Sequence, residues 1–307
     1  MTRRELLAGA AGALAAQRLS AFKSHITKAH ISAITDEIGK TQADAIEFAH
    51  HYGLQWVELR NVPETKKEFA FLTEPELKRW ATELEANKLK VSFLNTSLLK
   101  FTWPGLKGAE GKPETEEQKA ANQKRWDRRK DDVTMALNAA NILGCDKVRV
   151  FTGTRVTDPE SAFPLIVRTM EELTPLFEKA KCKLLIENEY SQNVGTSAET
   201  KAIMELLPSK TIGYNWDPGN AVHLKETPWP DGYKVLPVDR MLNAQFKARG
   251  LTPGSGETVD WKAIVEALQK DNYRYQIGLE THTGGPALIQ NANDAMSKML
   301  RIVEDVS

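Results

Sequence analysis

Four oxygen-bearing side chains stand at or near the ends of four consecutive apolar stretches of this sequence. They are Glu187, Asp217, Gln245 and Glu280. Three carboxylates and one amide oxygen form a hard donor set, which suits Mg²⁺ or Mn²⁺ better than a thiolate-preferring ion, with Zn²⁺ and Co²⁺ as alternatives. A helix cap, or an ion pair with a neighbour such as Arg60 or Lys247, would explain one such residue. It does not readily explain four on consecutive strands, so the sequence predicts a divalent-metal site.

The stretch from Leu184 to Glu189 is the clearest of the four. An apolar run that ends abruptly in acid is typical of a buried parallel strand. Side chains alternate along a strand, so Glu187 and Glu189 share one face and Asn188 takes the other. A carboxylate at the end of a buried strand is costly unless a cation or hydrogen bonds compensate it.

The elements that must position these residues alternate between strand and helix. Strands are predicted at 30–35, 55–59, 90–94, 147–151, 184–189, 211–216, 241–246 and 275–279, and helices at 42–52, 74–87, 126–143, 159–180, 197–207, 260–270 and 287–303, with a weak helix after the sixth strand. Such alternation implies a parallel sheet. Eight units fit one closed (β/α)₈ TIM barrel, an α/β single domain spanning 28–307. The rival, an open doubly wound sheet, would bring a Gly-rich dinucleotide loop after its first strand, and residues 35–39 are not one.

Two long connections lie on the side of the barrel where catalysis occurs. Residues 96–123 carry Trp103 and residues 221–240 carry Trp229. These tryptophans either stack on the face of a substrate ring or are ordinary half-buried loop aromatics. Long loops in this position are often lids, and the alternative for residues 106–120 is a disordered charged insertion.

Further polar side chains end other strands and are candidates for substrate binding. Glu58 and Arg60 either contact substrate or pair with each other, and Lys247 meets a hydroxyl or an anionic group. His282 shares a face with Glu280, where it either hydrogen-bonds a substrate oxygen or serves as a structural donor.

The amino-acid composition limits the kinds of partner that this protein could bind. Lys+Arg and Asp+Glu both number 41, which argues against nucleic-acid binding, and no apolar run reaches the roughly 20 residues of a membrane span. Residues 1–21 begin with Met1-Thr2-Arg3-Arg4 and continue with small and apolar residues, which predicts a twin-arginine-type signal and a periplasmic protein without a stable membrane anchor. The thiols of Cys145 and Cys182 are expected to be buried rather than bridged.

From about residue 28 onward, the sequence resembles the sugar phosphate isomerase/epimerase group of xylose isomerase-like TIM barrels. The resemblance lies in Ile186-Glu187-Asn188, the run from Trp216 to Asn220, the runs 228–233 and 253–261, and Gly278-Leu279-Glu280. It implies a Glu–Asp–His–Glu metal site that falls on Glu187, Asp217, Gln245 and Glu280. Gln245 replaces the usual His, as it does in hydroxypyruvate isomerases, and its carbonyl can still ligate a hard cation.

The resemblance also implies the chemistry. The metal chelates a carbonyl and an adjacent hydroxyl of a small carbohydrate, while Glu187 and Glu280 remove and return a proton beside that carbonyl. The outcome is isomerisation or epimerisation of a free sugar, a keto-sugar or a related hydroxy-carbonyl compound. A lyase or dehydratase acting on a keto-sugar, inosose or 3-keto-glycoside is the alternative, because its first half-step is the same. By analogy with the family, a homo-oligomer is expected.

Two other protein classes share part of this pattern. An apurinic endonuclease shares the barrel but needs several zinc ions and many histidines, and this chain has six His and no net charge. A non-catalytic sugar-binding barrel would fit the loss of the family's His at Gln245, but not the retention of both glutamates and Asp217.

Overall fold

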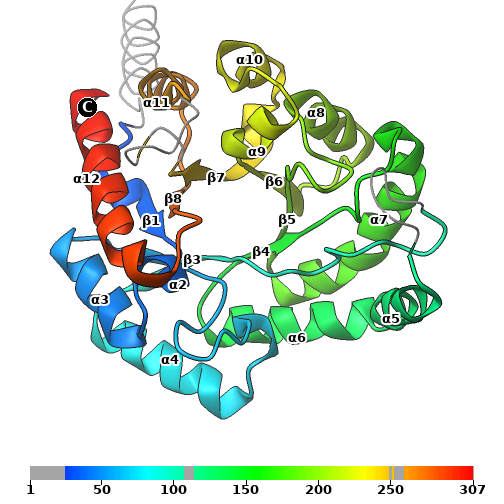
Figure 1. Cartoon of the computed structure of the whole chain (residues 1–307), viewed down its shortest axis with the longest axis horizontal. Helices are drawn as coiled ribbons and strands as arrows, with labels where there is room; N and C mark the ends of the chain where they lie inside the picture. Colours follow the sequence, from blue (N-terminus) through cyan, green and yellow to red (C-terminus); the bar gives the residue numbers. More distant parts are fainter. Residues whose placement is uncertain (1–24, 107–113, 249–250, 252–258, 307) are drawn as a thin grey trace, which may run out of the picture.

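Eight parallel strands, ringed by helices, form a barrel in the computed structural model (Figure 1). The structure describes residues 25–106, 114–248, 251 and 259–306. The strands are β1 (Ile31–Ala33), β2 (Trp56–Leu59), β3 (Lys90–Leu94), β4 (Lys147–Val150), β5 (Lys183–Glu187), β6 (Ile212–Trp216), β7 (Met241–Lys247) and β8 (Ile277–Glu280). Their order, β1-β8-β7-β6-β5-β4-β3-β2, runs once around the ring, and a parallel bridge between Ile34 and Glu58 joins its two ends. The predicted single-domain (β/α)₈ barrel is confirmed.

The helices follow the strands in chain order. They are α2 (Thr35–Ile38), α3 (Gln42–His51), α4 (Glu74–Ala86), α5 (Glu116–Asp127), α6 (Arg129–Ile142), α7 (Phe163–Ala180), α8 (Ser197–Leu206), α9 (Pro218–His223), α10 (Tyr233–Val235), α11 (Trp261–Lys270) and α12 (Leu288–Val306). Sequence signals set several starts. At α3, for example, Thr41 accepts a hydrogen bond from the amide of Asp44, and the Asp44 carboxylate accepts one from the amide of Thr41. Among the described residues, no helix is long and apolar enough to cross a membrane.

The third strand–helix connection differs from the prediction. One helix at 126–143 was expected, but α5 precedes α6, and the two meet at Arg128. Residues 116–120, part of the segment weighed as a disordered insertion, therefore belong to a helix. Thr115 caps it through a reciprocal pair of hydrogen bonds with Gln118.

Some predictions fall on residues outside the described part of the chain. The signal predicted at 1–21 and most of the run 253–261 are among them. Cys145 and Cys182, by contrast, are described, and both are buried free thiols, as expected.

Inward-facing side chains fill the barrel in layers. Phe93, Leu185 and Leu242 make a small apolar cluster separate from the main core. Also inside the barrel, the carboxylate of Glu58 accepts hydrogen bonds from four neutral side chains. The donors are Ser32 (2.9 Å), Asn95 (2.7 Å), Gln245 (3.1 Å) and Asn243 (3.4 Å). Burial raises the pKa of Glu58 above its ordinary value, and these hydrogen bonds offset part of the shift.

Gly278 on β8 leaves the space that the Glu58 carboxylate occupies. A Cβ added at Gly278 would lie 2.0 Å from Glu58 Oε1. We expect Gly278→Ala to lower the free energy of unfolding by about 1–3 kcal/mol, because the hydrogen-bonded Glu58 cannot move aside freely. Urea denaturation measures the change.

Gly284→Ala is the matched control, because an added Cβ there meets no atom within 4 Å and the backbone is extended at φ −151°. Equal losses of stability in the two variants would contradict the assigned role of Gly278.

Candidate functional site

Charged side chains surround a cavity of about 250 Å³ at the carboxyl ends of the strands. The charged residues that line this site cavity are Arg60, Glu68, Lys100, Arg149, Glu187, Glu189, Glu280 and His282. Because parallel strands all end on this side of a barrel, residues far apart in sequence meet here.

Glu187, at the end of β5, is held from one side. Its Oε2 accepts hydrogen bonds from Arg149 Nη1 at 2.9 Å and from Asn215 Nδ2 at 2.6 Å. Arg149 also donates to the backbone carbonyl of Thr96, so its guanidinium is fixed by the barrel wall. Within the described chain, Glu187 Oε1 makes no hydrogen bond. Glu187 therefore presents an oriented carboxylate with one oxygen available to a substrate.

Lys247 on β7 places an ammonium group among the predicted metal ligands. Its Nζ lies 2.7 Å from Asp217 Oδ2, 2.6 Å from Asn220 Oδ1 and 3.4 Å from Glu280 Oε2. Burial opposes the charge on Lys247, but the carboxylates led by Asp217 raise its pKa, so it stays protonated. Burial also raises the pKa of Asp217, and Lys247 counteracts that shift. The other oxygen of Asp217, Oδ1, caps α9 through the amide of Asn220 at 3.0 Å.

Glu280, at the end of β8, is the most heavily compensated carboxylate. Its Oε1 lies 3.0 Å from His282 Nε2 and 3.7 Å from Arg60 Nη1. Burial opposes ionisation, but Lys247, His282 and Arg60 together hold the pKa of Glu280 well below its usual range. The other oxygen, Oε2, is buried and receives no hydrogen bond of good geometry.

Glu37 is a site residue that the sequence reading missed. It lies on α2, directly after β1, and its Oε1 is 2.9 Å from Arg60 Nη1. Its Oε2 accepts hydrogen bonds from the amides of Thr281 and His282. Side-chain ligand atoms of Glu37, Glu280 and His282 all lie within 4.8 Å of one another. Two acids immediately after the first strand, Asp36 and Glu37, were the available signal.

Gln245 is fully buried and does not line the site cavity, although Asn215 connects it to the predicted ligand Glu187. Its Nε2 donates to Glu58, and its Oε1 accepts from Asn243 at 3.3 Å and Asn215 at 3.5 Å. A metal shared by all four predicted ligands would have to displace the Lys247 ammonium from Asp217 and Glu280. The four-residue metal site stays a prediction.

The other predicted substrate contacts lie in different places. Arg60 lines the site cavity and pairs with Asp36 and Glu37, whereas Glu58 is fully buried and does not pair with it. Trp103 is fully buried and packs against Trp126, 5.1 Å between ring centroids. Trp229 packs against Tyr233 at 5.5 Å. The lining residues of the site cavity include Arg60 and His282, but neither tryptophan.

His282 gives the site a titration that can be measured. The nearby carboxylate of Glu280 raises the pKa of His282 above its ordinary value of about 6.5, although burial acts against it. Because the folded-state pKa is raised, the His282–Glu280 pair stabilises the fold at low pH, and that contribution is lost as pH rises through the raised pKa.

We expect Glu280→Gln to lower the midpoint of the His282 ring-proton titration followed by NMR. Glu205→Gln is the control, because Glu205 forms an exposed pair with Lys201 far along the chain. An unchanged midpoint in Glu280→Gln would contradict the assigned pair.

Comparison with known proteins finds the same architecture elsewhere. Residues 46–304 match a family model described as xylose isomerase-like TIM barrel. No curated protein matches the sequence.

Solved structures resemble the fold at low identity. An IolI protein with a bound zinc atom superposes with a TM-score of 0.67 at 13% identity, over 91% of this chain and 99% of that one. The 3-keto-D-glucoside 4-epimerase YcjR from E. coli gives 0.63 at 13%, over 88% and 98%. The probable 3-DHS dehydratase AsbF from Bacillus anthracis gives 0.60 at 15%, over 87% and 97%. At these identities the likeness is one of fold.

Proposed function

The chain belongs to the xylose isomerase-like TIM barrel family, and from that premise we propose that it is an isomerase or epimerase of a carbohydrate. The substrate is a free sugar, a keto-sugar or a related hydroxy-carbonyl compound, and the reaction begins with proton abstraction beside its carbonyl. The observation that carries the proposal is the pair Glu187 and Glu280, two oriented carboxylates lining one cavity beside fixed cations.

Glu187 is the better placed base. Arg149 and Asn215 fix Oε2, which leaves Oε1 to accept a proton from a substrate carbon. The Arg60 guanidinium and the His282 ring lie beside the second carboxylate, Glu280. As hydrogen-bond donors they would stabilise the oxyanion that forms when the proton leaves.

Two donor sets could hold a divalent ion. Glu37, Glu280 and His282 supply two carboxylates and an imidazole within reach of one another, with the Arg60 guanidinium between the two carboxylates. The set of Glu187, Asp217, Gln245 and Glu280 holds Lys247 between two of its members. A bound ion, for which Mn²⁺ or Mg²⁺ is proposed, would polarise a substrate carbonyl as a Lewis acid.

A dehydratase or lyase is the second candidate. His282 lies next to Glu280, whose carboxylate raises the pKa of the ring above its ordinary value and so favours its protonated form. Such a donor could protonate a leaving hydroxyl or glycosyl oxygen after the shared first step. The proposed substrate is unphosphorylated because the sequence predicts export, and that inference is independent of the pocket.

Proton NMR in D₂O tests the reaction. The Mg²⁺-loaded full chain is incubated with free ketoses, hydroxypyruvate, inososes and 3-keto-glucosides. We expect loss of the C–H signal beside the carbonyl of a substrate. Glu187→Gln and Glu280→Gln should each slow this exchange by about 10²-fold or more.

The exposed carboxylate variant Glu205→Gln should exchange at the wild-type rate. The product distinguishes an isomerase from a lyase. Exchange that persists in Glu187→Gln would overturn the assignment of the base.

A second prediction concerns the metal donors. If Glu37, Glu280 and His282 hold the ion, Glu37→Gln weakens Mn²⁺ binding about tenfold or more, and Asp217→Asn changes it less. Electron paramagnetic resonance of free Mn²⁺ measures the affinity without turnover. The opposite ranking of the two variants would instead support the four-residue site.

A further inference from the structure

An ion pair between Lys100 and Glu189 forms one wall of the site cavity. Lys100 follows β3 and Glu189 follows β5, so the contact between them, 2.9 Å from Nζ to Oε2, is made across the carboxyl end of β4. In the ring of eight strands β4 lies opposite β8, which ends in Glu280 and continues to His282. The Lys100–Glu189 pair and the Glu280–His282 pair therefore lie on opposite walls of one cavity.

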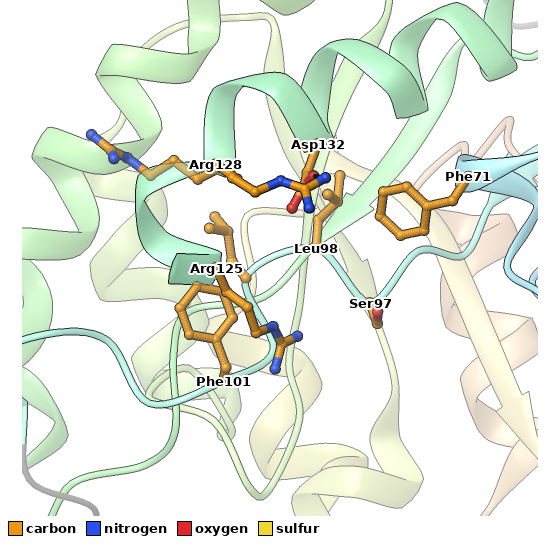
Figure 2. A pocket seen from close by; sticks show the side chains of 9 residues that line it. Phe71, Ser97, Leu98, Phe101, Arg125, Arg128 and Asp132 are labelled. Atoms are coloured by element: carbon orange, nitrogen blue, oxygen red, sulfur yellow. Dashed lines mark hydrogen bonds and ion pairs between the residues drawn. The ribbon is translucent and has the colours of Figure 1, made fainter. Parts of the chain in front are cut away.

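Lys100 is fixed in place, although its side chain is 38% exposed. Its Nζ lies 4.5 Å from the ring centroid of Phe151, the residue directly after β4, and the Arg149 guanidinium lies 4.8 Å from the same centroid. The segment that carries Lys100 is anchored as well, because the amide of Phe151 donates to the carbonyl of Leu98 at 3.0 Å. Figure 2 shows Leu98 and Phe101 of this segment beside a neighbouring cavity, and both are buried.

The pair offers a ligand one acceptor and one donor side by side. Glu189 Oε2 is engaged by Lys100, whereas Oε1 accepts no hydrogen bond from any described residue. An ammonium group carries three hydrogens, so Lys100 keeps donors for a ligand besides the one directed at Glu189. Two neighbouring hydroxyl groups match this arrangement, because one can donate to Glu189 while the other accepts from Lys100.

The charges around the cavity favour an uncharged ligand. The other cationic residues that line it also have carboxylate partners. They are Arg149 with Glu187, His282 with Glu280, and Arg60 with Asp36 and Glu37. A phosphate or carboxylate group of a substrate would have to compete with these partners and would meet their like charge, whereas a hydroxyl group would not.

We propose that the Lys100–Glu189 pair determines substrate specificity by binding two neighbouring hydroxyl groups at the end of the substrate remote from its carbonyl. This inference rests on the proposed function, which places the carbonyl beside Arg60, Glu280 and His282. The substrate is then an uncharged polyhydroxy carbonyl compound whose carbon chain reaches from one wall of the cavity to the other. A three-carbon compound would leave the pair unused.

Ligand-observed NMR titrations of the Mg²⁺-loaded full chain, recorded before turnover alters the ligand, test the pair. The ligands are the four D-2-ketohexoses and dihydroxyacetone, which has the carbonyl but no remote hydroxyl groups. The wild-type protein should bind at least one ketohexose tenfold or more tightly than dihydroxyacetone. Lys100→Met and Glu189→Met should each lose about tenfold or more in affinity for that ketohexose, because each removes a hydrogen bond to a charged group. Neither should change the affinity for dihydroxyacetone.

Lys119→Met and Glu116→Met are the matched controls, because these residues form an exposed ion pair of 2.7 Å on α5. Both controls should bind every ligand as the wild type does. The proposal is overturned if no ketohexose binds more tightly than dihydroxyacetone, if the pair variants behave like the controls, or if they lose both kinds of ligand equally.

The titrations also separate this proposal from the proposed function, because binding requires no turnover. Pair-dependent binding without proton exchange in D₂O would count against the proposed function alone. Proton exchange on a ketohexose whose affinity is unchanged in Lys100→Met would count against the pair alone.

Discussion

The need to compensate buried negative charge governs the centre of this barrel. Glu187, Asp217 and Glu280 are each at most 3% exposed, and none could stay ionised there alone. Cationic side chains on neighbouring strands compensate this charge, chiefly Arg149 on β4 and Lys247 on β7. Loss of one partner from such a buried pair costs about 3–5 kcal/mol, so these contacts constrain the strand ends as strongly as they shape the site.

Each compensating contact also determines which carboxylate oxygen remains accessible to a ligand. Arg149 hydrogen-bonds one oxygen of Glu187, and the other oxygen remains available on the cavity side. By contrast, both oxygens of Asp217 are engaged, one by Lys247 and the other by the first turn of α9. Glu280 has three cationic neighbours and accordingly a low pKa. Two carboxylates with different surroundings can play different roles in one reaction, as proton acceptor and as anchor.

The architecture could be read from the sequence because it depends on local patterns. Alternating apolar runs and amphipathic segments locate strands and helices, and parallel strand ends must converge. For that reason Glu187, Glu280, Arg60 and His282 could be placed on one cavity before the structure was known. The helix α5 was missed because it buries none of its residues, so no apolar periodicity marks it.

The depth of each side chain could not be read in the same way. Strand alternation gives the face but not the layer, so Gln245 and Lys247 look equivalent in sequence. In the structure Gln245 joins the Glu58 layer while Lys247 reaches the site. Gln245 is hydrogen-bonded to Glu58, which is almost two hundred residues away in the sequence. Gly278 leaves the space that the Glu58 side chain occupies. Three-dimensional packing, rather than spacing, decides such placements.

The closure of the barrel has a thermodynamic consequence. Between β1 and β2 the described sheet is joined at the Ile34–Glu58 bridge, and α2 reinforces the seam from above through Arg60 and the backbone after β8. Glu37 thus belongs both to the contacts that close the barrel and to the candidate metal-ligand set. Any ligand that engages Glu37 would therefore also bind a residue that holds this seam together. Occupancy of such a site would thus be coupled, through one carboxylate, to the stability of the barrel closure.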